Sequence, residues 1–174
     1  MAEASPTTPH AAPKGATAFT HTTTSRRFSE LLGTLAQAIV AERDIAHIWS
    51  HDPAFRDWRD ESELLWQRAA EEAAAVFDGP VLRPADRVLI RAARILHYAL
   101  GCERPAEYDA AVADLAACSE SLALRRENAV TGRTYQLLRM AEARLAEIGD
   151  LEMIPTASDP DLQDGLDDWP PIAC

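Results

Sequence analysis

Asp44, His47 and His51 form the strongest candidate for a metal site in this sequence. Their spacings of three and four residues place the side chains one above another on a helix. Imidazole and carboxylate groups are common ligands of zinc and iron. A zincin, however, has Glu directly after the first histidine, where Ile48 stands here, and a di-iron bundle needs a Glu-x-x-His motif on two helices. A surface histidine pair near a helix end is therefore the preferred interpretation.

Arg87, Arg91 and Arg94 form the candidate anion-binding site. They recur at helical spacing opposite an apolar stripe, and guanidinium groups bind carboxylates and phosphates in bidentate geometry. The recognition helix of a DNA-associated regulator carries such a stripe. A net charge of −11 disfavours that function, because it repels the phosphate backbone, so nucleic acid is not an expected partner. A solvated basic face is the simpler interpretation.

Trp49 and Trp58 lie on either side of an expected helix–helix corner. Tryptophan is enriched at the centres of protein interfaces, so this pair is a candidate partner-binding patch. The competing interpretation, which needs no partner, is a core in which large rings pack against many alanines.

The C-terminal segment 152–174 alternates large apolar residues with six acidic residues and contains no basic one. Leu162, Leu166 and Trp169 are its candidate partner-binding residues, since such segments order when they dock into an apolar groove with a basic rim. The simpler interpretation is an unstructured, solubilising tail.

No catalytic residues and no cofactor are expected. The sequence contains no G-x-S-x-G, phosphate-binding loop or G-x-G-x-x-G motif. Three cysteines without a C-x-x-C pair indicate free thiols in a reducing compartment. No apolar run approaches the roughly 18 residues of a membrane span. We therefore expect a cytoplasmic, non-enzymatic protein without a membrane partner.

The composition predicts an all-α fold. The chain has 174 residues, of which 33 are alanine and 7 glycine, while aromatic residues make up 6%. Alanine favours helices, and the scarcity of β-branched and aromatic residues argues against a sheet. The Ala-rich and Arg-rich composition also suggests a bacterial source.

Proline and glycine positions predict where the helices begin and end. We expect the first helix to start near Ser25, with Ser25 or Ser29 as its cap, and the second to start at Asp52-Pro53 and to end at Gly79-Pro80 with a left-handed glycine. The short connection between them predicts an antiparallel hairpin, with Trp58 on its apolar stripe. Further helices are expected from Pro84 to Gly101, from Pro105 onward, and from a Thr131 cap to Gly149. The pattern leaves open whether the last two are one bent helix.

These observations predict an antiparallel helical hairpin elaborated into a four- to five-helix bundle over residues 25–151. A disordered Ala/Thr/Pro-rich N-terminal segment (1–24) precedes it and an acidic, flexible tail (152–174) follows it. The leading hypothesis for function is a protein–protein interaction or adaptor module that binds another protein or a second copy of itself. The alternative is a small-molecule or metal-binding bundle that uses the Asp44/His47/His51 set or the arginine stripe.

Overall fold

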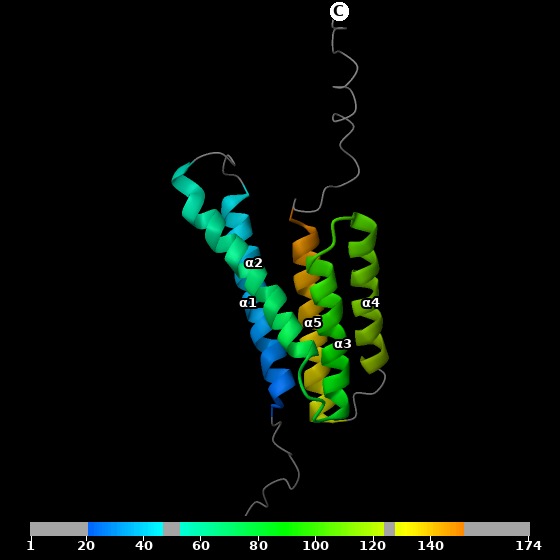
Figure 1. The fold of residues 1–174 in the computed structure, drawn as a ribbon. Coiled ribbons are helices and arrows are strands. Elements are labelled where there is room, and N and C mark those ends of the chain that lie inside the picture. Colours follow the sequence, from blue (N-terminus) through cyan, green and yellow to red (C-terminus); the bar gives the residue numbers. More distant parts are fainter. Residues whose placement is uncertain (1–20, 47–52, 124–127, 152–174) are drawn as a thin grey trace, which may run out of the picture.

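Five helices make up the fold in the computed structural model, which describes residues 21–46, 53–123 and 128–151 (Figure 1). No strand occurs in these ranges, so the predicted all-α class is confirmed. The helices are α1 (Thr23–Ile45), α2 (Arg56–Phe77, preceded by a 3₁₀ turn at Pro53–Phe55), α3 (Pro84–Leu100), α4 (Pro105–Ala123) and α5 (Ala129–Gly149). Residues 1–20 of the predicted disordered N-terminal segment and all of the tail from residue 152 lie outside the described residues.

The caps predicted for two helices are wrong by three residues or more. Thr22, rather than Ser25 or Ser29, caps α1: its Oγ1 accepts a hydrogen bond from the Ser25 amide at 3.1 Å. At α5, Asn128 is the cap and Thr131 is its reciprocal partner, since the Asn128 side chain accepts from the Thr131 amide at 3.0 Å. In both cases the capping oxygen belongs to the residue three positions before the amide that it binds. The extended backbone of that residue lets its side chain reach the free amide.

Gly79 does not adopt the predicted left-handed conformation. The helix α2 ends at Phe77, and the next residue, Asp78, keeps right-handed angles of φ −84° and ψ −3°. A Cβ atom at Gly79 would lie 2.9 Å from the Val76 carbonyl oxygen. Glycine is therefore required here because the backbone of this turn passes too close for a side chain.

The five helices alternate in direction. Helices α1, α3 and α5 run one way, and α2 and α4 run the other way (Figure 1). The predicted α1–α2 hairpin is present, with the two helices packed against each other, and α4 and α5 pack as two separate helices. Helix α1 also contacts α5 and α3, which closes the layer of helices into a bundle.

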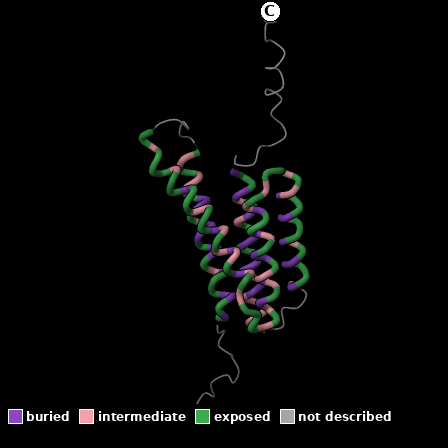
Figure 2. The backbone as a smooth tube through the Cα atoms, viewed as in Figure 1, coloured by how far each residue is buried: buried purple, intermediate pink, exposed green. Residues whose placement is uncertain are grey.

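The core lies where the start of α1 and the end of α2 meet α3, α4 and α5. Fully buried apolar side chains come from all five helices: Phe28, Leu31, Leu35, Ile39, Val76, Leu89, Leu96, Leu115, Leu137, Leu138 and Leu145. Figure 2 shows that buried residues are concentrated in the part of the molecule where all five helices pack together. Exposed residues predominate at the far end of the α1–α2 hairpin. We call residues 40–46 and 53–66 the arm, and the remaining described residues the bundle.

Asp86 is a buried carboxylate in the bundle, only 2% exposed. It accepts hydrogen bonds from the Thr22 hydroxyl at 2.7 Å and from the amides of Leu82 and Arg83 at 2.9 and 2.8 Å. These bonds tie the start of α1 to the start of α3. Sequence analysis did not single out this residue, although an acid in the first turn after Pro84 is a recognisable capping signal.

Among the described helices, none combines the length and the apolar composition that crossing a bilayer requires.

Candidate functional site

The predicted metal site is only partly described. Asp44 is exposed near the end of α1, and His47 and His51 lie outside the described residues. Within the described ranges, no three His, Cys, Asp or Glu side chains come together as a metal site would need. Metal binding at Asp44, His47 and His51 therefore stays a prediction.

The arginine stripe lies on the exposed face of α3. The Arg94 guanidinium lies over the Phe77 ring of α2, 5.8 Å from its centroid, while the Arg91 charge acts on Cys118 of α4. All three arginines are exposed to solvent, and only Arg94 has a ring contact with another helix among those described. Anion binding by Arg87, Arg91 and Arg94 stays a prediction.

Trp58 is not a core residue, although its place in the apolar stripe predicted one. It is 53% exposed, and its ring packs edge-on against Phe55 at a centroid distance of 5.5 Å. The reason is that the arm is the end of the α1–α2 hairpin, which extends past α3, α4 and α5 (Figure 1). The other predicted partner-binding residues, Trp49, Leu162, Leu166 and Trp169, lie outside the described residues.

An open groove runs between α1 and α2 on the arm, and we call it the outer groove. It has a volume of about 680 Å³, and all of its described lining residues come from these two helices. Val40 and Trp58 on its walls are 56% and 53% exposed, and Leu64 on the same arm is 64% exposed. The lining residues are Ala36, Gln37, Val40, Ala41, Asp44, Trp58, Glu61 and Leu65. Two large apolar side chains, Val40 and Trp58, are thus left uncovered on the walls of one groove.

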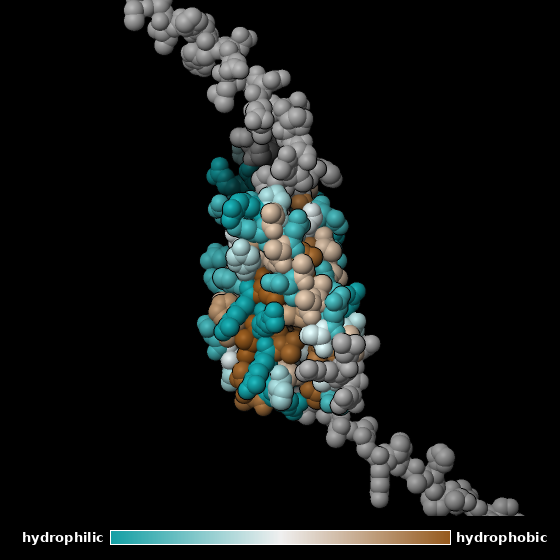
Figure 3. Space-filling view, turned by 90° about the vertical axis from the view of Figure 1, so that its right-hand side faces the viewer, coloured by the Kyte–Doolittle hydropathy of each residue, from teal (hydrophilic) through white to brown (hydrophobic). Residues whose placement is uncertain are grey.

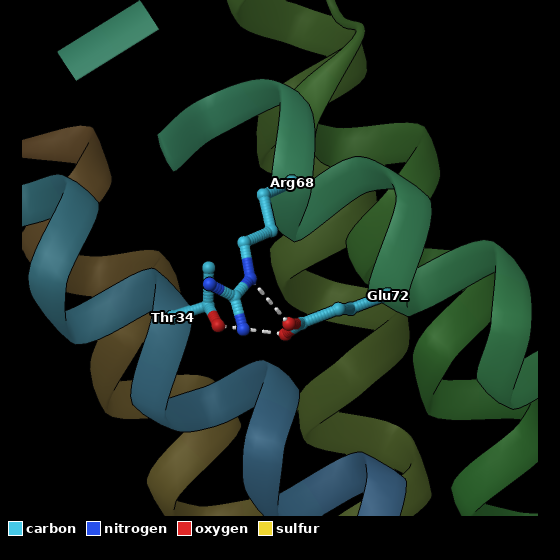
Figure 4. A network of polar contacts seen from close by, with 3 residues as sticks. All are labelled: Thr34, Arg68 and Glu72. Atoms are coloured by element: carbon cyan, nitrogen blue, oxygen red, sulfur yellow. Dashed lines mark hydrogen bonds and ion pairs between the residues drawn. The ribbon is translucent and has the colours of Figure 1, made fainter. Parts of the chain in front are cut away.

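A polar network joins the two helices in line with this groove (Figure 4). Glu72 accepts a hydrogen bond from the Thr34 hydroxyl at 2.7 Å and pairs with the Arg68 guanidinium at 2.9 Å. Thr34 precedes Gln37 of the groove by one turn, and Arg68 follows Leu65 by one turn. The Glu72 side chain, which is only 23% exposed, thus links α2 to the buried Thr34 of α1.

A second cavity, the inner cleft, lies between the arm and the ends of α3, α4 and α5. Its volume is about 380 Å³. Glu42 of α1 lies in its wall and accepts hydrogen bonds on Oε2 from the Ser62 hydroxyl at 2.7 Å and from the Trp66 indole at 3.2 Å. The lining residues are Glu42, Ile45, Arg59, Ser62, Glu63, Trp66, Ala99, Leu100, Cys102, Tyr108 and Ile148.

The thiol and the phenol of the inner cleft are both uncharged at neutral pH. Burial raises the pKa of Cys102, whose Sγ donates to the Tyr98 carbonyl at 3.3 Å. Burial also raises the pKa of Tyr108, whose hydroxyl donates to the Leu145 carbonyl at 2.5 Å. A nucleophilic cysteine needs a lowered pKa, so Cys102 is not activated. Among the described lining residues, Glu42, Glu63 and Arg59 carry a charge.

The side of the molecule that carries α4 offers a mixed surface. Figure 3 shows that its apolar areas lie mainly in the lower half and are crossed by polar side chains. Interspersed surface of this kind is ordinary for a folded protein, and no site is assigned to it.

Comparison of the chain with models of known protein families, with curated proteins and with solved structures finds no match. The outer groove and the inner cleft are therefore the observations on which a function can be argued.

Proposed function

We propose that this protein is a non-enzymatic interaction module that binds an amphipathic helix of another protein in the outer groove. The observation that carries the proposal is the exposure of Val40 and Trp58, each more than half uncovered, across one groove. Neighbouring large apolar side chains on a surface favour a partner that removes them from water. Tryptophan is also the residue type most enriched at binding hot spots.

The length of the groove suits a short helical segment. Ala36 and Asp44, the first and last α1 residues that line it, are eight positions apart, which is about 12 Å along a helix. A partner helix would cover that distance with apolar side chains at positions i, i+3 or i+4, and i+7. The occupant is therefore expected to present one apolar stripe of about two turns.

The negative charge of the outer groove indicates which proteins could supply this helix. Asp44 and Glu61 line the groove, and none of its described lining residues is Lys or Arg. A second copy of the chain carries the same net charge of −11, and the segment 152–174 carries six acids and no base. Like charges disfavour both occupants. A helix with basic residues beside its apolar stripe, from a different protein, complements the groove.

Site-specific photo-cross-linking in the source cells tests this proposal. A benzophenone amino acid replaces Gln37, which is exposed in the groove, so that Val40 and Trp58 stay intact. We expect one protein to be captured through a peptide with helical apolar periodicity and flanking Lys or Arg. The matched control places the cross-linker at Leu82, which is 61% exposed outside the groove, and does not capture that peptide.

The companion variant is Trp58→Ala in the Gln37 cross-linking chain. It removes a hot-spot ring and should lower the yield of the cross-link on the order of tenfold. A main product with residues 152–174 of the same chain, or with a second copy, would refute the proposal. Equal capture from positions 37 and 82, or no capture at either, also counts against it.

A further inference from the structure

The inner cleft is a second site, on the other side of the arm from the outer groove. Its volume of about 380 Å³ falls in the range of cavities that bind small molecules, about 300–1,000 Å³. Three walls enclose it: α1 and α2 of the arm, the end of α3 with the following turn, and the α4 and α5 residues Tyr108 and Ile148. An inference about this cleft does not depend on the function proposed for the outer groove.

Most of the wall is apolar. Ile45 comes from the arm, Leu100 from the end of α3 and Ile148 from α5, and all three line the cleft. Ile45 and Leu100 are only half-buried, whereas Ile148 is 5% exposed. Covering apolar surface contributes about 25 cal/mol per Å², so an apolar ligand body between these residues is favoured.

One carboxylate of the wall has both of its described hydrogen bonds on the same oxygen. Ser62 and Trp66 donate to Oε2 of Glu42, and both donors are neutral. A carboxylate has about four lone-pair positions, so Glu42 retains acceptor capacity as well as its negative charge. Ser62 is 1% exposed, so the arm holds this carboxylate in place from a buried anchor.

Among the described lining residues, the charged side chains give the cleft an excess of one negative charge. Glu63 adds a second carboxylate to Glu42, and Arg59 supplies one positive charge and has an interaction of its own. Trp66 brings an aromatic ring to the wall that carries Glu42, and Tyr108 brings a second ring to the cleft from α4. A carboxylate beside aromatic rings is the combination that recognises ammonium groups, through ion pairing and cation–π attraction.

We propose that the inner cleft binds a small organic cation, with its ammonium group at Glu42 and its apolar body between the arm and the ends of α3 and α5. Ligand binding would bridge the arm to the bundle, because the cleft wall contains residues of both.

Calorimetric titration with three probes of equal apolar body tests the assignment. 4-Phenylbutylamine is a cation, 4-phenylbutanol is neutral and 5-phenylvalerate is an anion, and each has four methylene groups between the ring and the polar group. We expect the amine to bind about tenfold more tightly than the alcohol, which corresponds to one charge-assisted hydrogen bond, and the acid to bind most weakly. Equal affinities for the three probes, or no binding of the amine at millimolar concentration, would overturn the proposal.

Glu42→Gln is the decisive variant. Its amide oxygen still accepts from Ser62 and Trp66, so the fold is preserved while the charge is lost. We expect the affinity for the amine to fall about tenfold and the affinity for the alcohol to stay unchanged. The matched control is Asp44→Asn, which removes one charge from the outer groove of the same helix and leaves amine binding intact. Unchanged amine affinity in Glu42→Gln contradicts the assignment.

Alkylation of Cys102 gives a measurement on the unsubstituted chain. Because this thiol lines the cleft, a bound amine should slow its alkylation, read by peptide mass spectrometry, while Cys174 serves as the reference in the same sample. If saturating amine leaves the Cys102 rate unaltered relative to Cys174, the ligand binds elsewhere and the proposal is wrong.

Discussion

The bundle and the arm are built from the same two helices, yet their surroundings differ. Along the first half of α1, Phe28, Leu31 and Leu35 are fully buried against neighbouring helices. Farther along the same helix Val40 is 56% exposed, and on the arm segment of α2 Trp58 is 53% exposed. The two helices contact each other in both regions, so the difference comes from α3, α4 and α5, which pack along the bundle and meet the arm only at the inner cleft. A two-helix hairpin buries one face per helix, and a third layer is needed to bury the remainder.

The polar contacts that join helices differ between the bundle and the arm. In the bundle, Asp86 is 2% exposed and organises a helix start and a loop. In the arm, the contact between helices centres on the half-buried Glu42, which accepts from Ser62 and Trp66. Few buried apolar contacts and more accessible hydrogen bonds are features of segments that open locally. The arm is therefore expected to be the less stable of the two regions.

The largest expected effect is that of a core truncation in the bundle. Leu96 is fully buried, so Leu96→Ala removes apolar contacts and leaves a cavity. The free energy of unfolding should fall by about 2–5 kcal/mol, measured by urea denaturation. The same change at Leu64 of the arm, which is 64% exposed, should alter it by no more than about 0.5 kcal/mol. Similar losses at the two positions would remove the distinction between bundle and arm.

Removing the buried carboxylate of the bundle should have the next largest effect. Asp86→Ala leaves the Thr22 hydroxyl and the Leu82 and Arg83 amides without this acceptor. The expected loss is about 1–3 kcal/mol in the free energy of unfolding, because buried donors lose their partner. Asp109→Ala, at an exposed position on α4, is the matched control and should have little effect. A neutral Asp86→Ala variant would show that these bonds contribute nothing net.

A smaller effect is expected where the hairpin leaves the bundle. Thr34→Val keeps the shape of the side chain and removes the hydroxyl that donates to Glu72, which still pairs with Arg68. We expect a loss of about 0.5–1.5 kcal/mol, the net contribution of one hydrogen bond. Hydrogen exchange should show faster opening of α1 amides near residue 34, with rates at α4 nearly unchanged. Uniform acceleration in all helices would mean that the arm and the bundle open together.

The smallest effect on stability belongs to the residue with the largest proposed role in binding. Trp58→Ala should change the thermal unfolding midpoint little, equivalent to no more than about 0.5 kcal/mol, because the ring is already half in solvent. Loss of cross-linking with retained stability would separate binding from folding. A strong destabilisation would instead show that Trp58 is a structural residue of the hairpin.

Sequence reasoning located the helices well and their caps less well. The Pro84 and Pro105 starts are where they were predicted, since proline fixes the backbone angle locally and lacks an amide that would be unpaired there. Thr22 was missed as a cap because Ser25 and Ser29 have equally suitable side chains, and only the path of the preceding residues decides which oxygen reaches a free amide. The pairing of Glu72 with Thr34 was missed because the two residues lie 38 positions apart.

The sequence by itself predicted four or five amphipathic helices and the antiparallel hairpin, because apolar periodicity, proline positions and short connections act over a few residues. That α4 and α5 are two helices and not one bent helix is a result of the tertiary structure. Only the tertiary structure decided that the hairpin extends past α3, α4 and α5. That arrangement turns Trp58 from an expected core residue into surface, and brings Glu42 and Cys102 to one cleft. Burial depends on the distance to chain segments far away in sequence, which no local pattern encodes.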